Sequence, residues 1–366
     1  MAYLPLSTAN LPDPAIDPAQ GSSPADYFNT VLWTGDGTSP RNITTVGFEP
    51  SLVWWKTRNQ SYDHRLYDQV RGTGKRLGSN STAAETTTTE LTAFNSDGFT
   101  LGNGAASAGN GSGETMVAWN WKANGSGVSN TDGSIASQVS ANTESGFSII
   151  TYTGNGTAGA TVGHGLNSAP EMIIIKARND TDSWPVYHVG NTYSGSPENS
   201  QLNLNSTTDG SGGATPAIWW NSTAPTSSVF SLGTNGGLNQ STELYVSYVF
   251  HSVEGFSKFG SYEGTNNADG PFIYLGFRPK FFLLKNVDSA LQWIIFDGER
   301  DPYNVVGKRI FPNLANAESA VPSNSAMDFL SNGVKIRVAG GYDINDTGTY
   351  IYMAFAENPF KYSNAR

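Results

Sequence analysis

Cysteine is absent from this chain of 366 residues. That absence excludes disulfides, iron–sulfur clusters, thiolate zinc sites and cysteine nucleophiles. Histidine is scarce, and its four copies do not have the spacing of a metal-binding motif. We therefore expect no catalytic metal and no resident cofactor.

Charge is also low. Charged residues make up 14% of the chain, against about 25% in a typical soluble protein, and the net charge is −10. Excess negative charge repels phosphate backbones, so nucleic acid is not an expected partner. No apolar stretch approaches the ~20 residues that cross a bilayer, so we expect no membrane insertion. The N-terminus lacks the basic and apolar regions of a secretory signal, which predicts a soluble protein made in a cytoplasm.

The chain is instead rich in glycine, polar turn residues and aromatics, and one motif occurs three times. In each copy a glycine precedes a proline, and an apolar run then ends in a lysine six residues after that proline. The three proline and lysine pairs are Pro50 and Lys56, Pro170 and Lys176, and Pro279 and Lys285. A motif that recurs at a spacing of about 110–120 residues indicates tandem copies of one structural unit.

Other landmarks recur in the same order. Each copy closes with a strand-like segment of alternating aromatic residues, at 116–121, 245–250 and 350–355. An Asp-x-x-Arg sequence follows the motif in the first copy, at Asp68 and Arg71, and in the third, at Asp297 and Arg300. We interpret these pairs as structural ion pairs at strand ends.

The segments between turns are short and rich in β-branched and aromatic residues, and Asn-Gly and Asp-Gly pairs separate them. The sequence therefore predicts an all-β fold of three tandem related β-sandwich or jelly-roll-like domains, preceded by an extended N-terminal arm. The expected segments are the arm 1–26, domain 1 at 27–123, a Gly/Ser/Asn-rich linker at 124–145, domain 2 at 146–254 and domain 3 at 255–366.

Two features indicate strands that are buried on both faces. Met172–Ile175 is continuously apolar, as in a strand with a core on each side. Trp54 and Trp55 are adjacent, so in a strand they point to opposite faces. We expect one of the two in the core of its own unit and the other against a neighbouring copy or subunit, or facing outward.

Six segments are specific as a set, at 4–18, 27–35, 46–50, 96–99, 117–123 and 357–361. In these segments the chain resembles virion structural proteins of marine tailed phages, which are described as tail-fibre-like or as structural proteins without an assigned role. The resemblance implies a non-enzymatic protein of the virion, assembled in the host cytoplasm, in the tail fibre or receptor-binding apparatus. It also implies a homotrimer that contacts host surface carbohydrate. A single-chain pseudo-trimeric head is an alternative, as is a head fibre or capsid decoration protein.

The arm is the expected contact with other virion proteins. Proline fixes the backbone and removes a hydrogen-bond donor, so five prolines within residues 1–26 predict an extended, non-helical segment. The candidate docking residues are Leu4, Pro5, Leu11, Pro12, Pro14 and Ile16.

The candidate glycan-binding residues lie in the second copy, because flat aromatic faces beside polar side chains suit sugar rings. They are Trp219, Trp220, Asn221 and Trp184. Packing between copies is the plainer interpretation of such tryptophans.

Two further hypotheses remain open. A polysaccharide-degrading tailspike would need a pair of carboxylates, for which Asp297, Glu299 and Asp301 are candidates. A bound Ca²⁺ would need clustered Asp and Asn oxygens, as at 179–182 or 343–346, although turns explain both clusters equally well.

Overall fold

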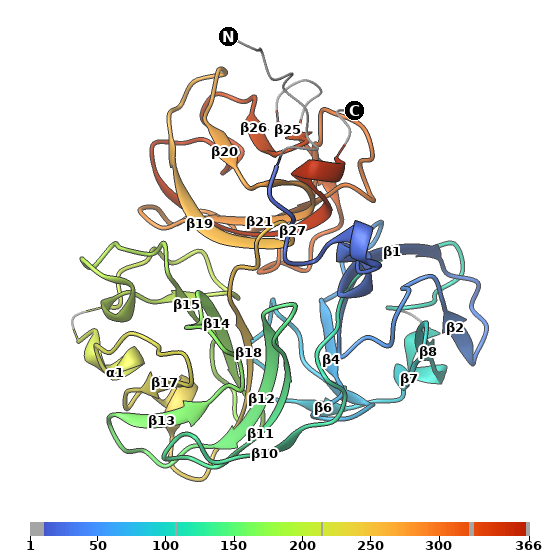
Figure 1. Ribbon diagram of the computed structural model, residues 1–366. Coiled ribbons are helices and arrows are strands. Elements are labelled where there is room, and N and C mark those ends of the chain that lie inside the picture. The colour runs from blue at the N-terminus through green and yellow to red at the C-terminus, as the bar shows by residue number, and fades with distance from the viewer. Residues whose placement is uncertain (1–10, 107, 214, 322–325, 364–366) are drawn as a thin grey trace.

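The computed structural model describes residues 11–106, 108–213, 215–321 and 326–363 (Figure 1). Within these ranges the fold is all-β, as the sequence predicts. The sheets are antiparallel, and each helix is a turn of three or four residues. No helix in the described ranges is long and apolar enough to cross a membrane.

The strands fall into three consecutive sets, which we call the first, second and third units. The first unit contains β1 (Phe28–Thr34), β2 (Arg41–Ile43), β3 (Leu52–Thr57), β4 (Arg65–Asp68), β5 (Lys75–Arg76), β6 (Thr86–Thr87), β7 (Leu91–Asn95), β8 (Gly98–Leu101) and β9 (Thr115–Trp121). The second contains β10 (Val128–Asn130), β11 (Ser137–Asn142), β12 (Phe147–Thr153), β13 (Ala160–Gly163), β14 (Met172–Ala177), β15 (Pro185–His188), β16 (Leu202–Asn203), β17 (Val229–Leu232) and β18 (Leu244–Phe250).

The third unit completes the chain. It contains β19 (Ser257–Gly264), β20 (Phe272–Tyr274), β21 (Phe277–Asn286), β22 (Ile294–Asp297), β23 (Lys308–Arg309), β24 (Ser319–Ala320), β25 (Met327–Leu330), β26 (Gly333–Ile336) and β27 (Gly348–Pro359). The short helices are η2 (Pro18–Gln20), η3 (Pro24–Asp26), η4 (Asn103–Ala106), η5 (Pro197–Asn199), α1 (Ala217–Trp220), α2 (Gly236–Asn239) and η6 (Phe360–Tyr362).

One strand order occurs in all three units. The main sheets run β1-β9-β3-β4 and β19-β27-β21-β22, and the same order, β12-β18-β14-β15, forms the centre of the seven-stranded second sheet. The register also repeats, because Leu52, Met172 and Phe281 lie opposite Trp121, Phe250 and Phe355. A smaller sheet accompanies each main sheet on its outer side: β2-β8-β7, β13-β17 and β20-β26-β25 (Figure 1).

Each main sheet is buried on both faces. In β3, Leu52 and Trp54 join a core at the centre of the molecule, whereas Val53 and Trp55 join a core between the two sheets of the first unit. The alternating side chains of β14 and β21 divide in the same way. The prediction that the continuous apolar runs are strands buried on both faces is confirmed, as is the opposite placement of Trp54 and Trp55.

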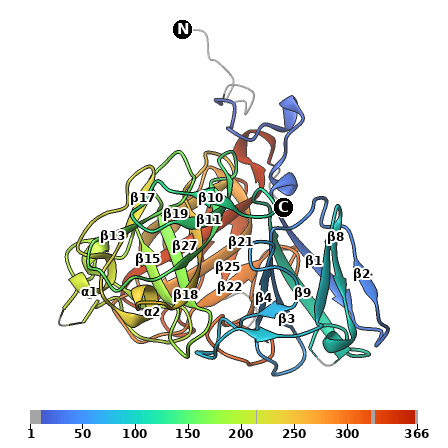
Figure 2. The ribbon, with the colours of Figure 1, turned by 90° about the horizontal axis from the view of Figure 1, so that it is seen from below.

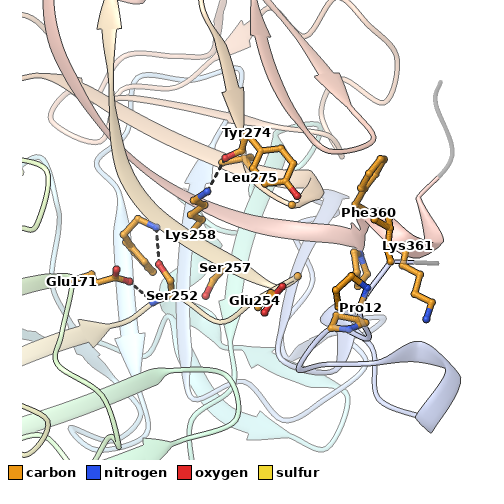
Figure 3. A pocket seen from close by; sticks show the side chains of 16 residues that line it. Pro12, Glu171, Ser252, Glu254, Ser257, Lys258, Tyr274, Leu275, Phe360 and Lys361 are labelled. Atoms are coloured by element: carbon orange, nitrogen blue, oxygen red, sulfur yellow. Dashed lines mark hydrogen bonds between the residues drawn. The ribbon is translucent and has the colours of Figure 1, made fainter. Parts of the chain in front are cut away.

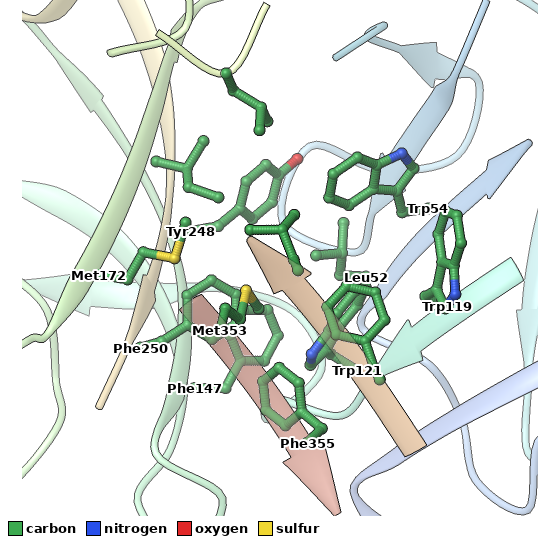
Figure 4. Packing of buried hydrophobic residues seen from close by; sticks show 14 of the residues in the cluster. Leu52, Trp54, Trp119, Trp121, Phe147, Met172, Tyr248, Phe250, Met353 and Phe355 are labelled. Atoms are coloured by element: carbon green, nitrogen blue, oxygen red, sulfur yellow. The ribbon is translucent and has the colours of Figure 1, made fainter. Parts of the chain in front are cut away.

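The central core joins the three units into a ring. Its residues come from every unit: Trp54, Trp119 and Trp121 from the first, Met172, Tyr248 and Phe250 from the second, and Phe281, Met353 and Phe355 from the third (Figure 4). Aromatic contacts cross the unit boundaries, such as Trp121 with Phe355, whose ring centroids are 5.8 Å apart. Each unit thus buries its inner face only by packing against the other two.

The lysine of the repeated motif has the same role in each unit. Its side chain is fully buried, and its ammonium group donates to the backbone oxygens of the first and fourth residues after it. These hydrogen bonds fix the turn that follows β3, β14 or β21. The lysines are Lys56, Lys176 and Lys285. Burial lowers the pKa of each of them to about 8.

Two expected segments are corrected by the structure. The expected linker 124–145 contains β10 and β11, which extend the second sheet, because Val139 alternates with polar residues and faces the core of that unit. The prediction of an extended, non-helical arm is wrong for residues 18–20 and 24–26, because η2 and η3 each begin at a proline, whose fixed φ suits the start of a helix. The described part of the arm packs against the ring, with Ile16 in the central core at 2% exposure. It lies at one end of the ring (Figure 2).

Candidate functional site

The candidate glycan-binding residues are mostly buried. Trp184 has no exposed surface, and its indole nitrogen donates to the backbone oxygens of Gly78 and Ser81 in the first unit. Trp220 is buried in the core of the second unit and donates to the oxygen of Ser200. The expectation that these two tryptophans offer a face to a sugar is therefore wrong, since both rings are buried by packing within and between units.

Trp219 and Asn221 remain partly exposed, in and just after α1. The indole of Trp219 packs against the core of the second unit and donates to the oxygen of Gly212 at 2.9 Å. Asn221 ends the helix in a left-handed conformation with φ of 53°. They form part of a single helical turn at the outer edge of the second unit (Figure 1).

The candidate docking residues of the arm also divide. Leu4 and Pro5 lie outside the described residues. Ile16 belongs to the central core and Pro14 is buried beside Gly255, so neither is available to a second protein. Pro12 is exposed and Leu11 is half-buried, and both line a cleft at the arm end of the ring.

The carboxylates considered for glycoside cleavage are held in structural contacts. Asp297 is fully buried and pairs with Arg300 at 2.5 Å. Asp301 accepts the backbone N–H groups of Gly307 and Lys308. Glu299, which is partly exposed, pairs with Lys280. Their contacts favour the structural interpretation of this segment.

The two Asp-x-x-Arg sequences form matching contacts between units, which we call clasps. In the first clasp Arg71 pairs with Asp68 at 2.5 Å and with Glu85 at 3.1 Å. Glu85 also receives both donors of Arg178, and Asp68 accepts the hydroxyl of Tyr248, so this clasp joins the first unit to the second.

The second clasp has the same geometry between the third and first units. Arg300 pairs with Asp297 at 2.5 Å and with Glu318 at 3.1 Å. Glu318 receives both donors of Arg58, and Asp297 accepts the indole N–H of Trp119. Burial opposes the charged form of Glu318, but the two guanidinium groups outweigh it and hold its pKa below the usual range.

At the seam between the second and third units, uncharged residues occupy the positions that correspond to the aspartate and arginine of each clasp. His188 lies opposite Met172, as Asp68 lies opposite Leu52, and Asn191 follows it where an arginine follows each aspartate. The Nε2 of His188 donates to the oxygen of Tyr352, because Nδ1 accepts the N–H of Gly190. The ring is thus closed by two charged clasps and one neutral seam.

Two clefts lie at the arm end of the ring, beside the turn that joins the second and third units. The first has a volume of about 530 Å³ and the second about 670 Å³. They share the wall residues Ser252 and Glu254, so they adjoin each other, and we call the two clefts together the groove. The walls come from the arm, from the start of the third unit and from the segment around η6.

The first cleft combines an exposed aromatic ring with charged groups (Figure 3). Tyr274 is 56% exposed, and the ammonium of Lys258 lies 5.2 Å from its ring centroid while donating to its backbone oxygen at 2.8 Å. Glu171 accepts the N–H of Ser252. The side chain of Glu254 has no hydrogen bond or ion pair with any other described residue.

His251 lines the second cleft and is only 7% exposed. Its Nδ1 contacts the oxygen of Ser252 at 2.9 Å, and a carbonyl can only accept, so Nδ1 carries the hydrogen. Its Nε2 is buried and has no hydrogen-bond partner among the described residues. Buried polar atoms nearly always have a partner, so this nitrogen is one of the exceptions.

Sequence reasoning missed this groove. Its residues are far apart in the chain and belong to no shared motif: Pro12, Glu171, Ser252, Lys258 and Tyr274. The alternation in β20, where Phe272 and Tyr274 are exposed around the buried Ile273, was the available signal.

The clusters considered for Ca²⁺ are turns. Asp180 and Asp182 accept the backbone N–H groups of the residues that follow them, and Asp346 accepts the N–H of Gly341. Within the described ranges, no three acidic or histidine side chains gather as a metal site. A bound Ca²⁺ stays a hypothesis.

The molecule is thus a single-chain ring of three alike β units. The chain belongs to the family of the domain of unknown function DUF7483, whose model matches residues 23–359. That match begins in the arm and ends with β27, so it spans all three units. No curated protein and no solved structure matches the chain.

Proposed function

We propose that this chain is a non-enzymatic structural protein of a phage virion, in the tail fibre or receptor-binding apparatus, where it contacts glycans on the host surface. The observation that carries the proposal is the ring. Three units with one strand order and one register close around a shared core, which gives a single chain the approximate symmetry of a homotrimer. One chain can therefore occupy the place of a trimeric head.

The contacts of the buried ionisable groups support the non-enzymatic part of the proposal. The buried charged groups of both clasps form contacts that join units, and His64 and His188 do so as well. The described part of the arm packs against the ring at Pro14 and Ile16, so the residues proposed to attach to other virion proteins are those that precede Leu11.

A head fibre or capsid decoration protein is the alternative, because an approximate three-fold ring also suits a three-fold site on a capsid. Copy number separates the two. A receptor-binding protein is present in a few copies per particle, whereas a decoration protein is present in tens to hundreds.

The experiment is competition for adsorption. Purified chain is added to host cells before the particles, and unattached particles are counted. The proposal predicts that adsorption falls as the concentration of the chain rises, whereas the same chain unfolded by heat has no effect. Absence of the chain from purified particles, measured by mass spectrometry, would overturn the proposal, and cleavage of host polysaccharide by the chain would favour the tailspike hypothesis.

A further inference from the structure

We infer that the groove at the arm end of the ring binds a neutral oligosaccharide. The groove consists of the two clefts that meet at Ser252 and Glu254. The inference rests on the proposed function, since it names the place where the chain would contact a host glycan. It also moves that place from the second unit to the junction of the second and third.

The shape of the groove suits a short chain of sugars. Each of its clefts has the volume of an ordinary small-molecule site, about 300–1,000 Å³. The two clefts adjoin at Ser252 and Glu254, and each is large enough by itself for a short saccharide. The wall residues come from the body of the ring and from the described part of the arm, whose Pro14 packs on Gly255.

Tyr274 supplies an aromatic face. A sugar ring presents C–H groups that pack on such a face, and Tyr274 is more than half exposed at 56%. Lys258 holds the residue in place by its contacts with the ring and with the backbone oxygen. An aromatic that is fixed before the ligand arrives loses little conformational entropy on binding.

The polar groups in the groove suit hydroxyls. Glu171 and Glu254 line the first cleft with Ser252, and Glu144 lines the second. Carboxylates accept hydrogen bonds from sugar hydroxyls. Among the described residues, three glutamates but only two lysines line the two clefts, and Lys361 pairs with Asp13 of the arm while Lys258 holds Tyr274. Excess negative charge disfavours an acidic sugar, so the groove fits a neutral one.

The test uses the full chain and short oligosaccharides cut from the surface polysaccharide of the host, with binding measured by calorimetry. We expect Y274A to weaken binding about tenfold through loss of the stacking contact. E254Q removes a charged acceptor and should weaken binding by a similar factor. The matched control is Y303A, which removes a tyrosine that is 75% exposed in the same unit and outside the groove.

The outcomes separate the groove from the proposed function. If the wild-type chain binds the oligosaccharides and Y274A and E254Q bind equally well, the groove is overturned and the proposed function stands. If the wild-type chain binds no host saccharide, both are overturned. Weaker binding by Y303A than by Y274A would also contradict the inference. Unfolding curves for each variant show whether the fold is intact.

Discussion

At the scale of single residues, two of the four histidines, His64 and His188, join units as neutral side chains. His64 accepts the indole N–H of Trp54 and contacts the oxygen of Phe311, so it joins the first and third units. His188 does the same between the second and third units. Each ring has one nitrogen that must accept, so protonation breaks a hydrogen bond as well as placing a charge in the core.

Acid should therefore destabilise the ring through these histidines. Burial lowers the pKa of His64 to about 3 and of His188 to about 4, from an ordinary 6.5. Between pH 6.5 and 4 the unfolded chain binds protons that the folded chain does not, so stability falls as the pH falls. For His188 alone, the free energy of unfolding falls by an amount on the order of 3 kcal/mol between pH 6.5 and 4.

The measurement is urea unfolding at pH 7 and pH 4.5. H188N cannot titrate, so it should lose less stability than the wild-type chain over this interval. An equal loss in both proteins would contradict the role given to His188.

The clasps give a second prediction at this scale. R300M leaves Asp297 buried without its cation, which should lower the free energy of unfolding by about 3–5 kcal/mol. R337M is the matched control, since Arg337 pairs with Asp328 at the surface and such pairs contribute about 0–1 kcal/mol. If chemical denaturation gave equal losses of unfolding free energy for the two variants, the clasp would contribute no more than a surface ion pair.

At the scale of elements, much of the fold could be predicted from the sequence. The strand runs, their burial on both faces and the recurrence of the lysine motif follow from local pattern. The strands β10 and β11 were predicted as a linker because they are largely polar, and their structure depends on the pairing of β10 with β11 and of β11 with β12. Trp219 and Trp220 are adjacent like Trp54 and Trp55, but they lie in a single helical turn. The rule that adjacent side chains of a strand point to opposite faces therefore does not apply to them.

The arm is an element of the fold as far as it is described. Ala15 donates to the oxygen of Glu254, and Ile16 enters the central core. I16A should therefore cost about 2–5 kcal/mol of stability through the cavity it leaves. P12A, at an exposed position of the same segment, should change stability by less than about 0.5 kcal/mol. Thermal unfolding of both variants tests this, and an I16A chain as stable as the wild type would contradict it.

At the scale of the whole molecule, the ring explains why local reasoning about the site failed. Trp184 looks like a sugar platform in sequence, but it lies at a boundary between units that exists only when the ring closes. The groove is also a product of closure, because Glu171 and Lys258 come from different units and meet only there. No spacing in the chain carries that information.

The ring also differs at its three boundaries. Two are charged clasps and the third, at His188, is neutral, and the groove lies beside the turn that connects the units of that third boundary.

The central claim is that one chain of this family forms a three-unit head on a virion. Electron cryomicroscopy of intact particles tests it most directly. The account predicts density for a single chain per attachment site, projecting from the tail in a few copies. Density for three chains around each three-fold axis, or particles without the chain, would contradict it.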